Sequence, residues 1–135
     1  MLGTGDNTDT STRTSAAFAI DRREIDRRTS VIALEGELDL ASAPQLKWML
    51  LDAIGEGHSQ LIVDLSLATF MDSTALGVLV GVNHGLGDAG TLAIVCAHAS
   101  LLKIFELSGM DGAFAISPTL EQALARLELP AAEAG

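Results

Sequence analysis

The sequence has few of the features that cross-link, anchor or export a chain. Cys96 is the only cysteine among 135 residues, so no intramolecular disulfide can form, and we expect a small buried apolar residue there. The first twenty residues lack the basic start and apolar run of a secretory signal. The most apolar stretch, residues 75–82, is far shorter than the roughly twenty residues that span a bilayer. We therefore expect a cytoplasmic protein without a transmembrane segment.

Basic residues are also scarce. The chain has 8 Lys and Arg against 18 Asp and Glu, which gives a formal net charge of −10. Residues 1–28 contain five acids and five bases, whereas residues 29–135 contain thirteen acids and three bases. Such a surface repels phosphate backbones and anionic lipids, which argues against nucleic-acid or membrane binding. A protein partner with a basic face fits this charge distribution.

Motifs for catalysis, metals and cofactors are missing. Ser73 lacks the Gly-x-Ser-x-Gly elbow of hydrolases, and the three histidines, His58 among them, have no recognisable orienting partner and are expected at the surface. Residues 85–90 are typical of a helix stop and not of a phosphate cradle. We predict no enzymatic activity, no cofactor and no metal site.

Asp64 ends an apolar run and invites comparison with the phosphate-accepting aspartate of a receiver domain. Such a site needs a clustered acidic pair and a lysine at a late strand end. The only lysines, Lys47 and Lys103, lie in predicted helices. We expect Asp64 to be structural.

One domain accounts for the length and composition. A chain of 135 residues with 48% hydrophobic content can bury a core without metals or disulfides. Residues 1–15 are polar and almost free of apolar side chains, so we expect a disordered leader there. The folded domain is expected over residues 16–128, followed by a flexible tail over residues 129–135.

Hydrophobic periodicity alternates between strand and helix patterns along the chain. The predicted strands cover residues 16–25, 30–37, 60–65, 91–96 and 113–116. The predicted helices cover residues 41–54, 73–86, 99–108 and 118–127, with Asp39 or Ser42 capping the first, and Ser117 and Pro118 starting the last. After an initial hairpin, this order predicts a single α/β domain with a mixed, mostly parallel sheet of four to five strands and about four helices.

The helix expected over residues 73–86 lacks charge on both of its sides, although a solvated helix face normally carries charges. Its apolar stripe consists of Leu76, Leu79, Val80, Asn83 and Leu86. The opposite side consists of Thr74, Val78, Gly81 and Val82. Two interpretations stay open: the helix is buried on all sides, or its second side is a docking face for another protein.

Asp72 and Ser73 stand where a strand ends and this helix begins. The free N–H groups of a first helical turn and the positive end of the macrodipole favour an anionic group, so a phosphate is best accommodated at Ser73. Taken without their context, an aspartate and a serine at this position are typical of an ordinary helix cap. Thr74 offers a second hydroxyl, which we rank below Ser73.

The sequence around these residues resembles that of an anti-sigma factor antagonist of the STAS domain family. The resemblance is carried by Gly-Glu-Leu-Asp at residues 36–39, Val-Asp-Leu-Ser at residues 63–66 and Phe-Met-Asp-Ser-Thr-Ala-Leu-Gly at residues 70–77. Leu-Ser-Gly-Met at residues 107–110 also matches, and the similarity extends over roughly residues 16–128. It implies a STAS fold for nearly all of the predicted domain.

The resemblance implies partner switching in transcription regulation. In that family the unphosphorylated protein binds an anti-sigma factor that is also a serine kinase, which frees the sigma factor, and phosphorylation ends the binding. Ser73 takes the phosphoacceptor position, Asp72 is the neighbouring acid, and Asp39 matches a loop acid that contributes to the kinase contact. A phosphoserine phosphatase resets such a switch, which often serves a stress response. Many relatives have glycine at Ala75, so we expect its methyl group to narrow the approach of the kinase.

Two other functions remain as alternatives. A non-switching STAS scaffold, as a subunit of a signalling assembly or of a lipid transporter, keeps the fold but shows no phosphate-dependent change in affinity. A sensor of a small ligand or nucleotide is the third possibility. In the preferred interpretation, Ser73 is the switch, Asp39 and Asp72 flank it, and the side of the helix opposite the apolar stripe contacts the partner.

Overall fold

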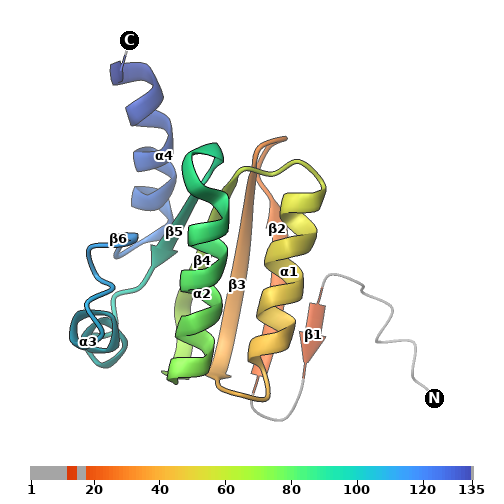
Figure 1. Cartoon of the computed structure of the whole chain (residues 1–135), viewed down its shortest axis with the longest axis vertical. Coiled ribbons are helices and arrows are strands. Elements are labelled where there is room, and N and C mark those ends of the chain that lie inside the picture. Colours follow the sequence, from red (N-terminus) through yellow and green to blue (C-terminus); the bar gives the residue numbers. More distant parts are fainter. Residues whose placement is uncertain (1–11, 15–17, 135) are drawn as a thin grey trace, which may run out of the picture.

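Six strands form one mixed sheet in the computed structural model, which describes residues 12–14 and 18–134 (Figure 1). The strands are β1 Thr12–Thr14, β2 Phe18–Glu24, β3 Thr29–Leu38, β4 Gln60–Met71, β5 Thr91–Val95 and β6 Ala115–Ser117. They lie side by side in chain order, antiparallel from β1 to β3 and parallel from β3 to β6. The helices are α1 Ala43–Gly55, α2 Ser73–Leu86, α3 Ala99–Leu107 and α4 Leu120–Ala134, with a 3-10 turn, η2, at Gly87–Ala89. The predicted α/β domain is confirmed.

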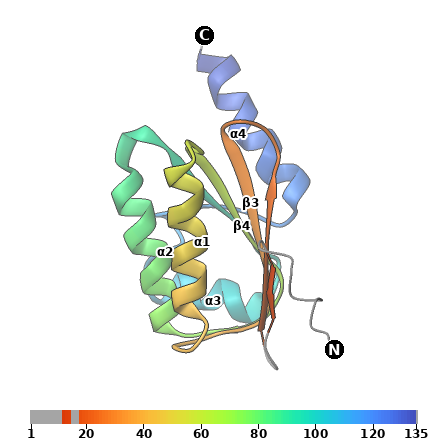
Figure 2. The ribbon, with the colours of Figure 1, turned by 90° about the vertical axis from the view of Figure 1, so that its right-hand side faces the viewer.

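The alternation of side chains along the central strands builds a hydrophobic core on each face of the sheet. In β4, Leu61 and Val63 belong to the core beneath α1 and α2, whereas Ile62 between them belongs to the core beneath α4. Figure 2 shows α1 and α2 together on one side of the sheet and α4 on the other. Burial on both faces explains why these strands are continuous apolar runs in the sequence.

The strand β4 is twice as long as predicted, because it continues past Leu65 to Met71. Its pairing with β3 contains two register shifts, between Ala33 and Glu35 and between Gly36 and Glu37. Such irregularities break the period of two on which strand prediction depends. The extension carries the chain directly to the start of α2.

The predicted start of the last helix is wrong. Ser117 is buried in β6, and α4 begins at Leu120, after Pro118. The Thr119 hydroxyl accepts a hydrogen bond from the N–H of Gln122 (3.2 Å), so it does the capping that the prediction gave to Ser117.

The ends of the domain also differ from the prediction. Helix α4 continues past the expected end at Leu127 to Ala134, through a segment rich in alanine, the strongest helix former. At the other end, β1 lies inside the predicted leader and pairs with β2. The remaining leader residues, 1–11 and 15, lie outside the described residues.

Candidate functional site

The N-terminus of α2 carries Ser73 as its first residue and Asp72 as its cap. Asp72 has extended backbone angles (φ −105°, ψ −179°), and its Oδ1 accepts hydrogen bonds from the N–H groups of Thr74 (2.9 Å) and Ala75 (3.1 Å). The N–H of Asp72 donates to the carbonyl oxygen of Leu38 (3.0 Å), which ties the cap to β3. Ser73 is exposed, and its hydroxyl has no hydrogen-bond partner among the described residues. The cap fixes the backbone and leaves this hydroxyl accessible to another molecule.

Asp39 follows the neighbouring strand and lies at the same edge of the sheet. The parallel pairing of Leu38 with Met71 places the residues after β3 beside those after β4. The Asp39 Oδ1 accepts hydrogen bonds from the N–H groups of Ala41 (3.0 Å) and Ser42 (3.2 Å), which shapes the loop into α1. The sheet therefore brings Asp39, Asp72 and Ser73 to one edge. The carboxylates of Asp39 and Asp72 accept hydrogen bonds from the backbone that follows each of them.

Two exposed apolar side chains lie at this edge, and neither was among the predicted site residues. Leu40, next to Asp39, is 72% exposed, and Phe70, two residues before Asp72, is 48% exposed. Exposed aromatic residues are enriched at protein interfaces. Phe70 was missed because it lies in the part of β4 where the alternation of buried and exposed residues breaks down.

Ala75 does not have the predicted effect on access to Ser73. Its side chain is fully buried in the core beneath α2. A methyl group that points into the core cannot obstruct an approaching kinase, so the expected narrowing is contradicted.

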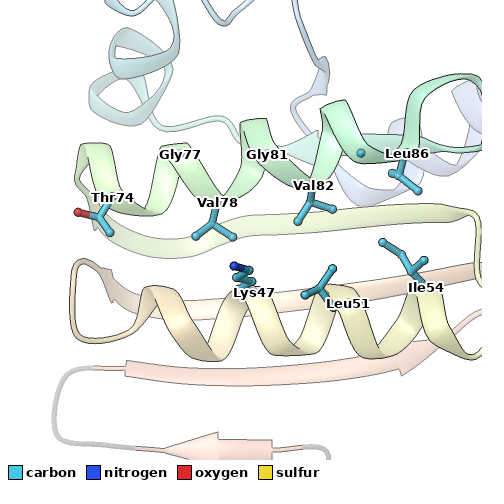
Figure 3. A pocket seen from close by; sticks show the side chains of 10 residues that line it. Lys47, Leu51, Ile54, Thr74, Gly77, Val78, Gly81, Val82 and Leu86 are labelled. Atoms are coloured by element: carbon cyan, nitrogen blue, oxygen red, sulfur yellow. The ribbon is translucent and has the colours of Figure 1, made fainter.

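A groove of about 560 Å³ runs between α1 and α2 (Figure 3). Its walls are almost entirely apolar. The lining residues are Lys47, Leu51 and Ile54 from α1, and Thr74, Gly77, Val78, Gly81, Val82, Gly85 and Leu86 from α2. The whole predicted docking face of the helix thus lines one concave surface, and the α1 wall was not predicted because only the tertiary structure places α1 there.

The predicted division of α2 into two faces needs one correction. Val82, assigned to the docking face, is only 7% exposed and belongs to the core, because α1 lies beside α2 on that side. Val80 and Asn83, assigned to the core stripe, are only half-buried. Thr74 and Gly81 are exposed as predicted, while Val82 lines the inner wall of the groove.

His58 is buried and partnered, contrary to the prediction of a surface histidine. Its Nε2 lies 2.7 Å from Oε2 of Glu24, and its Nδ1 is hydrogen-bonded to the hydroxyl of Ser30. A carboxylate only accepts, so Nε2 donates to Glu24. The arrangement of Ser, His and Glu resembles a hydrolase triad, but Ser30 has no exposed surface, and the cluster joins β2 and β3 to the segment between α1 and β4.

Cys96 is buried after β5, as predicted, and burial raises the pKa of its thiol. The backbone of His98 opposes this rise to a smaller extent than burial causes it. The thiol is therefore an apolar packing group and not a reactive thiolate.

Over the part of the chain that the structure describes, no three His, Cys, Asp or Glu side chains gather as a metal site would require. Within the same residues, none of the helices combines the length and the apolar character needed to cross a bilayer.

Known proteins share both the sequence pattern and the fold. An anti-sigma F factor antagonist of Lysinibacillus sphaericus is 32% identical over 105 residues, which cover 76% of this chain and 89% of the relative. A crystal structure of an anti-sigma factor antagonist from Mycobacterium paratuberculosis superposes with a TM-score of 0.76 at 25% identity, covering 84% of this chain and 97% of that one.

The protein SpoIIAA has been solved in two forms. Its unphosphorylated form matches with a TM-score of 0.71 at 28% identity, covering 80% of this chain and 95% of that one. Its phosphorylated form, described as a Bacillus cell fate determinant, matches with a TM-score of 0.66 at 29% identity, covering 81% and 99%. The model of the STAS domain family matches residues 20–123, and the chain therefore belongs to the STAS domain family.

Proposed function

We propose that this protein is an anti-sigma factor antagonist whose binding is controlled by phosphorylation of Ser73. The observation that carries the proposal is the exposed Ser73 hydroxyl at the capped N-terminus of α2. The names of the relatives support the general role, and a relative solved in phosphorylated and unphosphorylated forms supports the covalent switch. The partner is an anti-sigma factor with serine-kinase activity, and a phosphoserine phosphatase reverses the modification.

The position of Ser73 separates an effect on binding from an effect on folding. A phosphoserine adds about 1.5 to 2 negative charges and three strong acceptor oxygens. The positive end of the α2 dipole tolerates these charges, because Ser73 is the first residue of the helix. The partner surface would pack against the neutral hydroxyl beside the carboxylates of Asp39 and Asp72. It binds the phosphorylated protein more weakly, because the phosphate adds bulk and negative charge at that contact.

The size of the switch sets a requirement on the interface. Moving a partner from 99:1 bound to 1:99 needs a difference of about 5.5 kcal/mol in binding free energy. One lost hydrogen bond contributes only about 0.5 to 1.5 kcal/mol. Charge repulsion and the desolvation of a buried phosphate must therefore provide most of the difference, so the proposal requires Ser73 to lie inside the contact area.

The proposed contact surface has two parts. The first is the sheet edge with Asp39 and Asp72 around Ser73. The second is the adjoining side of α2, where Thr74, Val78 and Gly81 are accessible and Val82 lies deeper. Because sigma subunits act with RNA polymerase, we expect the protein to work in the cytoplasm as a non-enzymatic regulator, in a response such as stress.

The experiment that tests this function is calorimetric titration of the matched kinase with three forms of the protein: unmodified, phosphorylated on Ser73, and Thr74→Val. We expect the phosphoform to bind at least a thousandfold more weakly and Thr74→Val to remain phosphorylatable on Ser73. Tandem mass spectrometry of protein from its native cells, with and without stress, localises the phosphate.

Equal affinities for the unmodified protein and the native phosphoform would refute the switch. A complete absence of phosphate under all conditions would favour a non-switching STAS scaffold, as a subunit of a signalling assembly or of a lipid transporter. A Ser73→Asp variant is a weaker test, because its single charge is smaller than that of phosphate.

A further inference from the structure

The groove between α1 and α2 has more space than helix packing requires. Gly77, Gly81 and Gly85 follow one another a turn apart on its α2 wall, and a Cβ atom added at any of them meets nothing within 4 Å. Glycine is disfavoured in helix interiors relative to alanine. Close packing does not explain these three glycines, because each position has room for a side chain. Their effect is to keep the α2 wall of the groove open along its length.

Among the described residues that line the groove, Lys47 alone carries a charge. Helix α2 has no Asp, Glu, Lys or Arg, and the α1 acid, Asp52, is turned away to pair with Arg22 (3.2 Å). Lys47 reaches into the space between the helices (Figure 3) and forms no ion pair among the described residues. An apolar groove with an unpaired cation complements an apolar molecule that ends in an anion, through the local contact with Lys47 and against the net charge of the protein.

The dimensions of the groove match those of a small-molecule site. From Thr74 to Leu86 the groove follows α2 for about 18 Å, at a rise of 1.5 Å per residue. The groove holds about 560 Å³. Pockets for small ligands lie between about 300 and 1,000 Å³ and are mostly apolar with a few polar groups, as here.

We infer that this groove binds an amphipathic monocarboxylate, with the acyl chain along the glycine wall of α2 and the carboxylate at Lys47. The tail packs between Leu51 and Ile54 of α1 and Val78 and Val82 of α2 (Figure 3). Binding displaces water from apolar walls, which provides the affinity, and the ion pair with Lys47 selects the anionic end. The inference concerns the isolated protein and does not rest on the proposed switch at Ser73.

The test is methyl NMR of the full chain titrated with decanoate, below the concentration at which decanoate forms micelles. Decanol and decylammonium are titrated in parallel as ligands with the same tail and a different head. We expect saturable shifts at the methyl groups of Leu51, Ile54, Val78 and Val82. Decanoate should bind more tightly than decanol, and decylammonium more weakly than both.

Variants of the chain's two lysines separate the head-group contact from a general effect of charge. Lys47→Gln should weaken decanoate binding about threefold to fivefold, the effect of one partly exposed ion pair, and leave decanol unchanged. Lys103→Gln, on the exposed surface of α3, removes the same charge elsewhere and should change neither.

Filling the groove tests the site of the tail. Gly81→Leu, or Gly85→Leu if the first variant does not fold, should abolish decanoate and decanol binding while the methyl spectrum stays dispersed. Absence of saturable shifts in the groove, or equal decanoate binding by Lys47→Gln, overturns the inference. The inference is also overturned if an apolar helical peptide shifts these methyl signals and decanoate does not. That result would identify the groove as a docking site for a protein. None of these results tests phosphorylation of Ser73, because no kinase is present in the assay, although the ligand would occupy the α2 side that is also proposed to contact the partner.

Discussion

Replacing Asp72 with alanine removes two hydrogen bonds from the first turn of α2, those to the N–H groups of Thr74 (2.9 Å) and Ala75 (3.1 Å). Loss of an N-cap side chain costs about 0.5 to 2 kcal/mol of folding free energy. The carboxylate also interacts favourably with the helix dipole, which adds about 0.3 to 1 kcal/mol at an exposed terminus. We therefore expect Asp72→Ala to lower the free energy of unfolding by about 1 to 3 kcal/mol.

The matched variant is Asp72→Asn, because asparagine caps as well as aspartate but carries no charge. We expect it to retain most of the cap and to lose only the dipole contribution. Urea unfolding followed by circular dichroism measures both variants. With an m value of about 2 kcal/mol per M, Asp72→Ala should lower the midpoint by about 0.5 to 1.5 M and leave m unchanged.

The order of stability carries the test: wild type above Asp72→Asn, and Asp72→Asn above Asp72→Ala. If Asn and Ala are equally destabilising, the charge and not the cap holds the first turn, and the described geometry is not the source of stability. If neither variant is destabilised, α2 begins without help from Asp72, and its carboxylate serves binding alone.

Three further predictions follow from burial and backbone geometry. Leu79→Ala should lower the free energy of unfolding by about 2 to 5 kcal/mol, because Leu79 is fully buried, whereas Leu40→Ala, 72% exposed, should change it by less than about 0.5 kcal/mol in the same urea experiment. Gly90→Ala should lower the melting temperature, because the new Cβ would lie 2.3 Å from the Ser59 carbonyl oxygen. Gly81→Ala, with open space around the new Cβ, should raise the melting temperature by an amount that corresponds to about 0.5 to 1 kcal/mol of folding free energy. The Cys96 thiol should react with a colorimetric disulfide reagent at pH 8 much more slowly in the native protein than in urea, because burial raises its pKa; equal rates would show that it is accessible.

The local part of the candidate site could be predicted because it depends on short-range chemistry. The bounds of α2, Ser73–Leu86, agree with the prediction, since an aspartate cap before an apolar helix and a glycine after it are unambiguous signals. The same holds for the position of Ser73 at the helix start. The pattern around these residues also carried the resemblance to the STAS family, which the family match confirms.

The predictions that failed concern contacts between distant segments. His58 was expected at the surface because its partners, Glu24 and Ser30, are remote in sequence and meet only through the pairing of β2 with β3 and of β3 with β4. Val82 was placed on an outer face because periodicity defines faces of a helix but does not say that α1 will cover one of them.

The sequence by itself determined the α/β order, the capped start of α2 with its accessible hydroxyl, and the acidic charge, because each depends on neighbours along the chain or on composition. The tertiary structure alone decided that Asp39 and Ser73 share one sheet edge and that a groove with a single cation separates α1 from α2. The register of parallel strands and the packing of helices on a sheet set these distances, and both arise from contacts between residues far apart in the chain.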